Sequence, residues 1–392
     1  MTQYPLKRAC WLEISLDNMR DNFMAYKKMV GDEIKVMPAV KANAYGHGIV
    51  ACGKELEACG ADYLGVGDIS EAIQLREHGV EMPLLIFASN NIAEVVDYYI
   101  QYNLIPTILT ISEAQAISKA AGKTISVFVK IDTGRGRLGV NAEEFPAFFR
   151  GITKLPNIHV EGVYSHIAGG GWPGDGPDYT TWQYERFAAA IDALGEEGQN
   201  IPFRQLANTP VGIAYPGIRM TGVCPGRAIW GFSPLERRDG HPDLTYPMLA
   251  WKSRLVHINK VCGGKFGEKY AATKLEESKW IGIMAGGLSD GLPEKFAKGE
   301  VLIRGKRIPV ASSISLEHTI LDLRDLPEAE PGDEVVIIGK QGREEITLDQ
   351  RIAEWGRGIP SIWVDISSRL ARLYYKSGVL HSIWEGEKLT VL

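Results

Sequence analysis

The chain has 392 residues, of which 45% are hydrophobic and 23% are charged, and its formal net charge is −5 at pH 7. This length allows one large domain and one smaller one, and the balance of apolar and charged residues excludes an intrinsically disordered chain. The small negative charge gives no indication of a nucleic acid or an anionic membrane surface as a partner.

The cysteines and the N-terminal stretch bear on the cellular compartment. Five cysteines are scattered along the chain without a CxxC pair, so we expect neither a disulfide framework nor a metal site. The stretch MTQYPLKRACWLEISLDNM turns polar too early for a signal peptide, and no apolar run reaches about 18 residues. We therefore expect a cytoplasmic protein.

The region from about residue 15 to residue 232 alternates short apolar runs with amphipathic stretches. The runs rich in β-branched and aromatic residues predict strands, in chain order IKVMPAV, YLGVGD, LLIFAS, LIPTIL, ISVFVKID, IHVEGVYSH, FRQLAN and GRAIWG. The stretches between them, such as LDNMRDNFMAYKKM and YERFAAAIDALGEE, have apolar residues at helical spacing. This alternation predicts an α/β fold, a (β/α)8 TIM-type barrel. A doubly wound open sheet is the alternative, but no GxGxxG follows the first strand.

After Pro247 the pattern changes to strands joined by turns rich in glycine, proline and charge, with little helix before about residue 350. Examples of these strands are KSRLVHINKV, EVLIRGKRIPVASS and DEVVIIGK. We therefore predict a barrel over residues 13–245 and a C-terminal all-β domain over residues 246–392, on which residues 1–12 could also pack.

Polar side chains recur where the predicted barrel strands end, which is where barrel enzymes place their functional groups. They are Lys41, Asp132 with Arg137, His166, and Asn208 with Thr209. Lys41 ends the first strand, and a partly shielded amine there has a lowered pKa and can condense with a carbonyl, as the attachment lysine of pyridoxal phosphate does. Gly46 and Gly48 would let the backbone approach closely, and the Tyr45 hydroxyl could meet a phosphate. A surface lysine at a strand end is the alternative.

The stretch AVKANAYGHG around Lys41 resembles the cofactor-lysine signature of the alanine racemases, which are two-domain pyridoxal phosphate enzymes of fold type III. The blocks KIDTGRGRLGV, VEGVYSHIA, LANT and SDG match later segments of that family in the same order, so the resemblance spans nearly the whole chain. It implies an amino-acid racemase, an isomerase that depends on pyridoxal 5'-phosphate and acts as a homodimer with active sites shared between the subunits.

The resemblance also implies roles for individual residues. Lys41 is expected to bind the cofactor and to act as the base on one face of the substrate's α-carbon, and Tyr270 as the base on the opposite face, reaching in from the other subunit. Two such groups must flank the α-carbon, because racemisation removes a proton from one face and returns it to the other. Arg137 and Leu316 are expected to contact the substrate, and Lys130 matches a lysine that is carbamylated in some relatives. The other residues expected to bind the cofactor are Tyr45, His166, Asn208, Thr209, Gly226 and Arg227.

The chain departs from the family's pattern around the cofactor and the substrate. Cys224 stands where the family has an arginine facing the pyridine nitrogen, so a neutral thiol replaces a cation. Arg135 replaces a residue that is usually uncharged, and Leu316 replaces a methionine. We therefore expect a substrate other than alanine, either larger or acidic. Trp172, in a long glycine-rich loop, could close over a substrate, or that loop could be a mobile connector.

Three functions are open on the sequence alone. The first is racemisation or epimerisation of an amino acid. The second keeps the cofactor but breaks another bond at the α-carbon, as in a decarboxylase, an aldolase or a transaminase, and the loss of the arginine at Cys224 motivates it. The third is a protein that binds the cofactor without catalysis. The combination of Lys41, Arg137, His166 and Tyr270 favours an enzyme, since a binding protein does not need two opposed bases.

Overall fold

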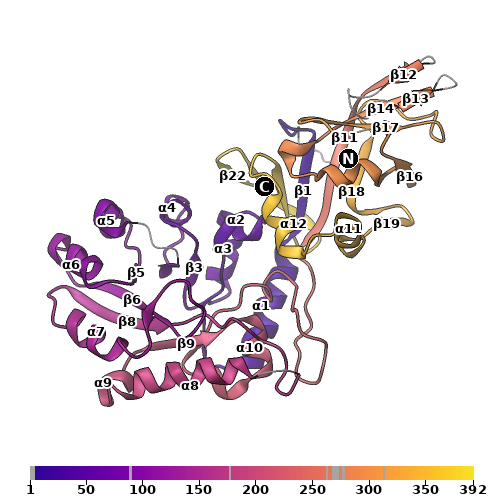
Figure 1. Ribbon diagram of the computed structural model, residues 1–392. Helices are drawn as coiled ribbons and strands as arrows, with labels where there is room; N and C mark the ends of the chain where they lie inside the picture. The colour runs from indigo at the N-terminus through magenta and orange to yellow at the C-terminus, as the bar shows by residue number, and fades with distance from the viewer. Residues whose placement is uncertain are drawn as a thin grey trace. The chain divides into compact units, whose positions relative to one another are not determined.

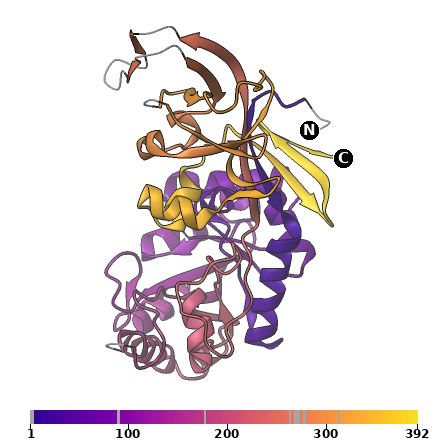
Figure 2. The ribbon, with the colours of Figure 1, turned by 90° about the vertical axis from the view of Figure 1, so that its right-hand side faces the viewer.

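The computed structural model describes residues 5–87, 91–175, 178–261, 264–266, 273–275, 279–311 and 314–392. Contacts between residues divide the chain into two compact units, whose elements are drawn in Figures 1 and 2. The barrel unit comprises Asn18–Ala44 and Cys52–Tyr246, and the β unit comprises Met1–Asp17, Tyr45–Ala51 and Pro247–Leu392.

The barrel unit is built on a closed ring of parallel strands. Neighbouring strands pair in the order β2-β10-β9-β8-β6-β5, and β3 pairs with β4. Parallel bridges between Ala39 and Gly65 and between Leu85 and Ile105 join these sheets, so that eight strands within the described residues close a (β/α)8 barrel. The strands are β2 (Lys35–Val36), β3 (Leu64–Val66), β4 (Leu84–Ile86), β5 (Thr107–Ile108), β6 (Ile125–Asp132), β8 (Ile158–Tyr164), β9 (Phe203–Ala207) and β10 (Gly222–Val223), with β7 (Val140–Asn141) pairing at the end of β6.

Helices alternate with these strands, as Figure 1 shows for α5 to α8 around the outside of the sheet. Side-chain caps fix where several of them begin: the Asp68 carboxylate caps α4, Thr110 forms a capping box with Glu113 at α6, and Asp178 caps α8. Such a cap contributes about 1 kcal/mol. The helices are α1 (Leu16–Val30), α2 (Lys41–Tyr45), α3 (Ile49–Ala58), α4 (Ile69–Glu77), α5 (Ile92–Gln101), α6 (Ile111–Ala120), α7 (Phe145–Ile152), α8 (Tyr179–Asp192), α9 (Glu196–Gln199), α10 (Thr209–Ala214) and the 3-10 helix η1 (Pro216–Ile218).

Aromatic side chains fill the inside of the barrel. The rings of Phe128 and Phe203 lie 5.5 Å apart, centre to centre, in a buried cluster. Glycines on neighbouring strands make room for them: a Cβ on Gly162 would lie 2.4 Å from the Phe128 ring, and one on Gly222 would lie 2.5 Å from the Phe203 ring. The barrel is therefore a packed core, and its chemistry belongs to the rim.

The eighth barrel strand differs from the prediction. Residues 226–231, read from GRAIWG as a strand, form turns in which the amides of Ile229 and Trp230 donate to the carbonyls of Gly226 and Arg227. The strand itself is β10, a few residues earlier. The prediction of a strand over 226–231 is wrong because a buried apolar run has the same composition in a strand and in a buried turn.

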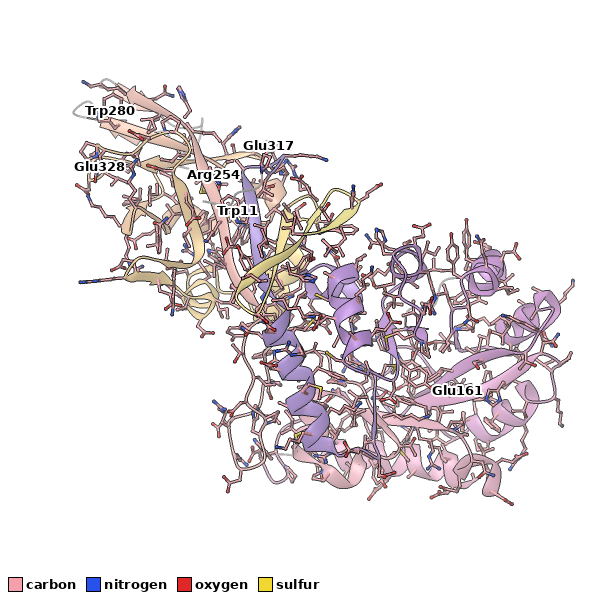
Figure 3. All side chains as sticks on the ribbon, turned by 180° about the vertical axis from the view of Figure 1, so that it is seen from behind. Trp11, Glu161, Arg254, Trp280, Glu317 and Glu328 are labelled. Atoms are coloured by element: carbon pink, nitrogen blue, oxygen red, sulfur yellow. The ribbon has the colours of Figure 1, made fainter. Side chains whose placement is uncertain are left out.

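The β unit contains a mixed sheet with the strand order β16-β15-β18-β11-β1-β20-β21-β22, in which β14 also pairs with β11 and β17, and β19 with β18. The N-terminal strand β1 runs antiparallel to β11 and parallel to β20. Its Trp11 side chain is fully buried, and the Arg254 guanidinium lies 5.2 Å from the ring centre (Figure 3). The strands are β1 (Cys10–Ser15), β11 (Met248–Val261), β12 (Gly264–Phe266), β13 (Thr273–Leu275), β14 (Lys279–Ala285), β15 (Glu300–Ile303), β16 (Lys306–Pro309), β17 (His318–Asp322), β18 (Glu334–Gln341), β19 (Glu344–Ile346), β20 (Ala371–Lys376), β21 (Val379–Glu385) and β22 (Lys388–Val391).

Short helices interrupt the strands of the β unit. The Thr347 side chain caps α11 by accepting a hydrogen bond from the amide of Gln350. The helices are η2 (Leu288–Asp290), η3 (Glu294–Lys298), α11 (Leu348–Trp355) and α12 (Ile359–Asp365). The prediction of a barrel followed by a C-terminal domain made essentially of strands is confirmed.

The segment Tyr45–Ala51 belongs to the β unit, and this explains two of its glycines. Gly46 and Gly48 have φ angles of 83° and 95°. A Cβ on Gly46 would lie 2.1 Å from the carbonyl oxygen of Trp363, and one on Gly48 would lie 1.9 Å from the hydroxyl of Tyr374. The Arg372 guanidinium also donates to the Gly46 carbonyl at 2.9 Å. The close backbone approach predicted from these glycines is thus made to α12 and β20.

Candidate active site

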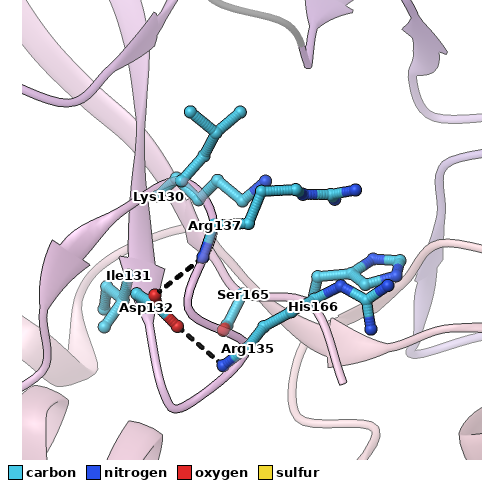
Figure 4. Close-up of a pocket in the computed structure, with 8 residues that line it drawn as sticks. Lys130, Ile131, Asp132, Arg135, Arg137, Ser165 and His166 are labelled. Carbon is cyan, nitrogen blue, oxygen red and sulfur yellow. Dashed lines mark hydrogen bonds between the residues drawn. The ribbon is translucent and has the colours of Figure 1, made fainter. Parts of the chain in front are cut away.

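The candidate active site lies where the barrel strands end. Parallel strands of a closed barrel bring their carboxyl ends to one rim, which is where barrel enzymes carry out their chemistry. A pocket at this rim is lined by Lys130, Ile131, Asp132, Arg135, Arg137, Leu138, Ser165 and His166 (Figure 4). The structure therefore brings together Arg137 and His166, two residues singled out from the sequence.

Lys41 follows strand β2 and starts a left-handed turn, which is the element α2. The φ angles of Ala42, Asn43, Ala44 and Tyr45 are 55°, 53°, 53° and 51°. Each L-residue in this conformation costs about 1–2 kcal/mol relative to a right-handed turn. Contacts from elsewhere in the chain must therefore hold the turn.

The carboxylate of Glu71, on helix α4, provides such a contact. One of its oxygens accepts a hydrogen bond from the amide of Asn43 at 2.7 Å, and the other accepts one from the amide of Gly67 at 2.8 Å. Burial raises the pKa of Glu71, although hydrogen bonds from the amides of Asn43, Gly67 and Ala42 act in the opposite direction. The sequence analysis missed Glu71, because the spacing from Asp68 to Glu71 is that of an ordinary helix start.

The amine of Lys41 has the properties expected of an attachment lysine. Burial is the main cause that lowers its pKa; Cys224 and Glu71 would raise it, whereas the guanidinium groups of Arg137 and Arg135 lower it further. The lowered pKa leaves more of the amine uncharged at neutral pH, and only the uncharged amine attacks a carbonyl.

Lys130 and His166 share this electropositive surrounding. The Lys130 residue is only 5% exposed, and its pKa is lowered to about 8. Burial is the largest cause of this lowering, and the charges of Arg137 and Lys41 are the next largest. Burial also lowers the pKa of His166 to about 3, and Arg135 is the next largest cause. His166 is therefore a neutral imidazole at neutral pH, and the site as a whole favours an anionic ligand.

Asp132 shapes the loop that carries the two arginines. Its carboxylate accepts hydrogen bonds from the amides of Gly134 and Gly136, both at 2.9 Å. It also accepts bonds from the amides of Arg135 at 2.8 Å and Arg137 at 3.2 Å, which Figure 4 shows. Burial alone would raise the pKa of Asp132, but these bonds from backbone amides lower it below its ordinary value. The carboxylate is thus engaged by the loop amides, while the Arg135 guanidinium donates to the carbonyl of Ile167 at 3.3 Å.

Side chains of helix α8 form hydrogen bonds with this loop. The Gln183 side chain donates to the Thr133 hydroxyl at 3.0 Å and accepts from the amide of Ala168 at 2.7 Å. The Tyr179 hydroxyl donates to the carbonyl of Gly134 at 2.7 Å. These bonds connect the loops after β6 and β8 to one helix.

The ends of β9 and β10 form a cradle suited to a phosphate. The buried Thr209 hydroxyl accepts a hydrogen bond from the amide of Ala228 at 3.2 Å, which joins the two segments. As the first residue of α10, Thr209 has no intrahelical acceptor for its own amide. The amides of Gly226 and Arg227 have no acceptor among the residues that the structure describes. Converging backbone amides of this kind bind phosphate oxygens.

Asn208 and Arg227, two further predicted residues of this region, also have structural partners. The Asn208 side chain caps α10 by accepting a hydrogen bond from the amide of Val211 at 3.2 Å. The Arg227 guanidinium is exposed and lies 5.6 Å from the centre of the Phe232 ring. Their roles toward a cofactor stay predictions.

Cys224 follows β10 and packs against the aromatic cluster of the barrel. Burial raises the pKa of its thiol to about 12, although Lys41 and Lys130 act in the opposite direction. The side chain at this position is therefore a neutral thiol at physiological pH.

The remaining predicted residues belong to the β unit, to another loop of the barrel unit or to the part of the chain that is not described. Tyr270 falls in a stretch that the structure does not describe. Leu316 belongs to the β unit and is 65% exposed, and Tyr45 belongs to the β unit as well. Trp172 donates from its indole to the carbonyl of Glu236 at 3.1 Å, and the Arg238 guanidinium lies 5.2 Å from its ring centre. Trp172 thus packs on a neighbouring loop in this conformation.

A closed barrel with a partly buried amine and a phosphate-type cradle at its rim, followed by a β domain, defines a class of two-domain barrel enzymes. Sequence models of two family domains match the chain, "Alanine racemase, N-terminal domain" over residues 14–234 and "Alanine racemase, C-terminal domain" over residues 248–374. The chain belongs to the alanine racemase family, whose members are pyridoxal phosphate-dependent isomerases.

Individual relatives agree with this assignment. The alanine racemase of Halothermothrix orenii is 32% identical over 377 residues, covering 94% of this chain and 97% of the relative. That of Desulfosudis oleivorans is 33% identical over 385 residues, covering 93% and 96%. Among solved structures, the alanine racemase of Clostridium difficile has a TM-score of 0.86 at 28% identity and covers 97% of this chain and 99% of that chain. The Bacillus anthracis alanine racemase with bound L-Ala-P has a TM-score of 0.85 at 26% identity, with the same coverage. In the described part of the chain, no helix is both long and apolar enough to span a bilayer.

Proposed function

We propose that the protein racemises or epimerises an amino acid with pyridoxal 5'-phosphate bound to Lys41. The observation that carries the proposal is the Lys41 amine, which is partly buried after a barrel strand, lies among cations and has a lowered pKa. In this proposal Lys41 moves a proton at one face of the substrate's α-carbon and Tyr270 moves one at the other face.

The residues present at the rim fit the cofactor. The backbone amides of Thr209, Gly226 and Arg227 would hold its phosphate, and the neutral imidazole of His166 would lie against its ring. Arg137 would hold the phenolic oxygen of the ring and the substrate carboxylate. When bound, pyridoxal phosphate supplies an electron sink for the charge that develops at the α-carbon.

We further propose that the substrate is an amino acid other than alanine, with an acidic amino acid as the first class to test. Arg135 adds a guanidinium to a pocket that already contains Lys130 and Arg137. Asp132 supplies only one negative charge against these three cations. A second carboxylate on the substrate would satisfy the additional cation.

The proposal also covers the oligomeric state of the protein and its cellular compartment. Tyr270 and Leu316 would act from a second copy of the chain, in a homodimer whose active sites are shared. We place the protein in the cytoplasm, as its scattered cysteines suggest. A domain boundary between residues 245 and 246 is part of the same proposal.

A screen of amino acids in deuterated buffer tests the function. Mass spectrometry detects deuterium at the α-carbon, and chiral chromatography detects the opposite enantiomer. The expected result is exchange with inversion that is lost in Lys41→Ala and retained in Lys119→Ala, a change at the end of helix α6. Release of carbon dioxide, glycine or a keto acid would instead favour the alternative Cα-bond cleavage that Cys224 motivates. A wild-type protein that takes up the cofactor and shows none of these reactions would contradict the proposal.

A further inference from the structure

Glu71 occupies a position that normally serves only its own helix. It is the third residue of α4, whose N-cap Asp68 accepts hydrogen bonds from the amides of Ser70 at 2.8 Å and Glu71 at 3.1 Å. In a capping box the glutamate at this position bonds back to the amide of the N-cap residue. Here one carboxylate oxygen bonds to the amide of Gly67, one residue before the cap, and the other reaches the amide of Asn43.

The hydrogen bond from the Asn43 amide to the Glu71 carboxylate joins two segments that are distant in sequence. Asn43 lies in the middle of the left-handed turn that begins at Lys41. The charged acceptor is fixed in place because the Asp68 cap anchors the first turn of α4. A charged acceptor forms a stronger hydrogen bond than a neutral one. Such a bond offsets part of the cost of the left-handed conformation, which L-residues avoid.

The same site touches the stem of Lys41. A Cβ on Gly67 would lie 3.0 Å from a carboxylate oxygen of Glu71 and 3.2 Å from the Cβ of Lys41. Glycine at this position therefore lets the loop after β3 lie against both side chains without displacing them. The direction in which the Lys41 side chain leaves the backbone depends on this contact and on the turn that Glu71 holds.

We propose that Glu71 is a positioning residue for Lys41: its carboxylate fixes the left-handed turn through the Asn43 amide and so aims the amine. The inference rests on the proposed function, in which Lys41 binds pyridoxal phosphate. Glu71 itself contacts backbone amides and acts through Lys41.

Three variants test this role. Glu71→Gln keeps the size of the side chain but turns an amide donor toward one of the backbone donors. Glu71→Asp keeps the charge but is one methylene shorter, so it cannot reach both amides. Glu77→Gln, at the exposed end of the same helix, makes the same change of charge away from the turn and is the matched control.

The first measurement is hydrogen–deuterium exchange of the peptide that contains the Ala42 and Asn43 amides. We expect exchange about tenfold faster in Glu71→Gln, a smaller increase in Glu71→Asp and no change in Glu77→Gln. The second measurement is the rate at which the cofactor-free protein captures pyridoxal phosphate at Lys41, followed by borohydride trapping and peptide mass spectrometry. We expect capture about tenfold slower in Glu71→Gln, with Glu71→Asp intermediate.

The outcomes separate positioning from general stability. Unchanged exchange in Glu71→Gln overturns the inference, and so does faster exchange with an unchanged rate of capture. If Glu71→Gln does not fold, the same two measurements on Glu71→Asp decide. A wild-type protein that captures no cofactor at Lys41 overturns the proposed function, whereas normal capture in every variant overturns only the role of Glu71.

Discussion

The hydroxyl of Thr209 accepts a hydrogen bond from the amide of Ala228, and this bond joins the segments that follow the last two strands of the barrel. Both residues are buried, Thr209 to 2% exposure and Ala228 completely. The bond fixes the turn that contains Gly226 and Arg227, whose amides we assign to the cofactor phosphate. The geometry of the cradle therefore depends on one hydroxyl.

Thr209→Val should weaken both the fold and the binding of the cofactor. Valine has the shape of threonine but leaves the buried Ala228 amide without an acceptor, which costs about 1–3 kcal/mol. Urea unfolding of the cofactor-free protein measures the loss of stability, and titration with pyridoxal phosphate measures the loss of affinity. Thr209→Ser keeps the hydroxyl and should retain most of the affinity. Equal behaviour of the valine and serine variants would contradict this account.

His166 should make the cofactor-free protein less stable in mild acid. Its pKa is lowered from 6.5 to about 3 in the folded state. Below pH 6.5 the unfolded chain therefore binds a proton that folded His166 does not, and stability falls as the pH decreases toward 3. Between pH 7 and pH 5 this single group removes about 2 kcal/mol from the free energy of unfolding.

Urea unfolding of wild type and His166→Gln at the two pH values measures this contribution. The variant should lose about 2 kcal/mol less than wild type over the same interval, because glutamine does not titrate. His159→Gln, which removes a half-exposed histidine from strand β8, is the control for the loss of an imidazole. Parallel losses in wild type and His166→Gln would show that His166 is accessible to protons in the folded protein.

The sequence identified the ends of the barrel strands well because each of them is marked by a short motif. Lys41, Arg137 and His166 follow predicted strands, and the structure places Arg137 and His166 in one pocket. The eighth strand was placed too late, because the short β10 has no periodic pattern while the buried turn after it is apolar.

The left-handed turn after Lys41 could not be predicted from the sequence. Alanine and tyrosine have no local preference for this conformation, and of its residues only Asn43 tolerates it well. One contact of the turn is the hydrogen bond from the Asn43 amide to Glu71, which lies 28 residues further along the chain. Local sequence patterns contain no information about such a contact. The role of Tyr270 stays a prediction, since it lies outside the described residues.

The thiol of Cys224 should be chemically inert although it lies near two amines. Burial raises its pKa from 9.0 to about 12. At neutral pH this lowers the fraction of thiolate, the reactive form, by about 1,000-fold. Alkylation of the folded protein with iodoacetamide, followed by peptide mass spectrometry, should label Cys59 faster than Cys224, although both side chains are partly exposed. Labelling of both cysteines at similar rates would mean that Cys224 is ionised, and the neutral group assigned to this position would be wrong.

Gly67→Ala should disturb the surroundings of Lys41 without preventing folding. The added methyl group would lie 3.2 Å from the Lys41 Cβ, which is backbone-anchored, and 3.0 Å from the Glu71 carboxylate, which can move. Overpacking of this kind costs about 1–3 kcal/mol, and the loss of glycine's freedom in the unfolded chain offsets about 0.4–1 kcal/mol of it. The remaining strain falls on the contact that aims the amine. We therefore expect a small loss in the free energy of unfolding together with slower capture of pyridoxal phosphate.

Gly122→Ala is the matched control for this change, because a Cβ at Gly122 would have no atom within 4 Å. The control should be as stable as wild type or more stable by up to about 1 kcal/mol, and it should capture the cofactor at the wild-type rate. Thermal unfolding and timed borohydride trapping measure the two quantities on the same preparations. If Gly67→Ala captured the cofactor as fast as Gly122→Ala, the packing of the loop after β3 against the Lys41 stem would have no part in placing the amine.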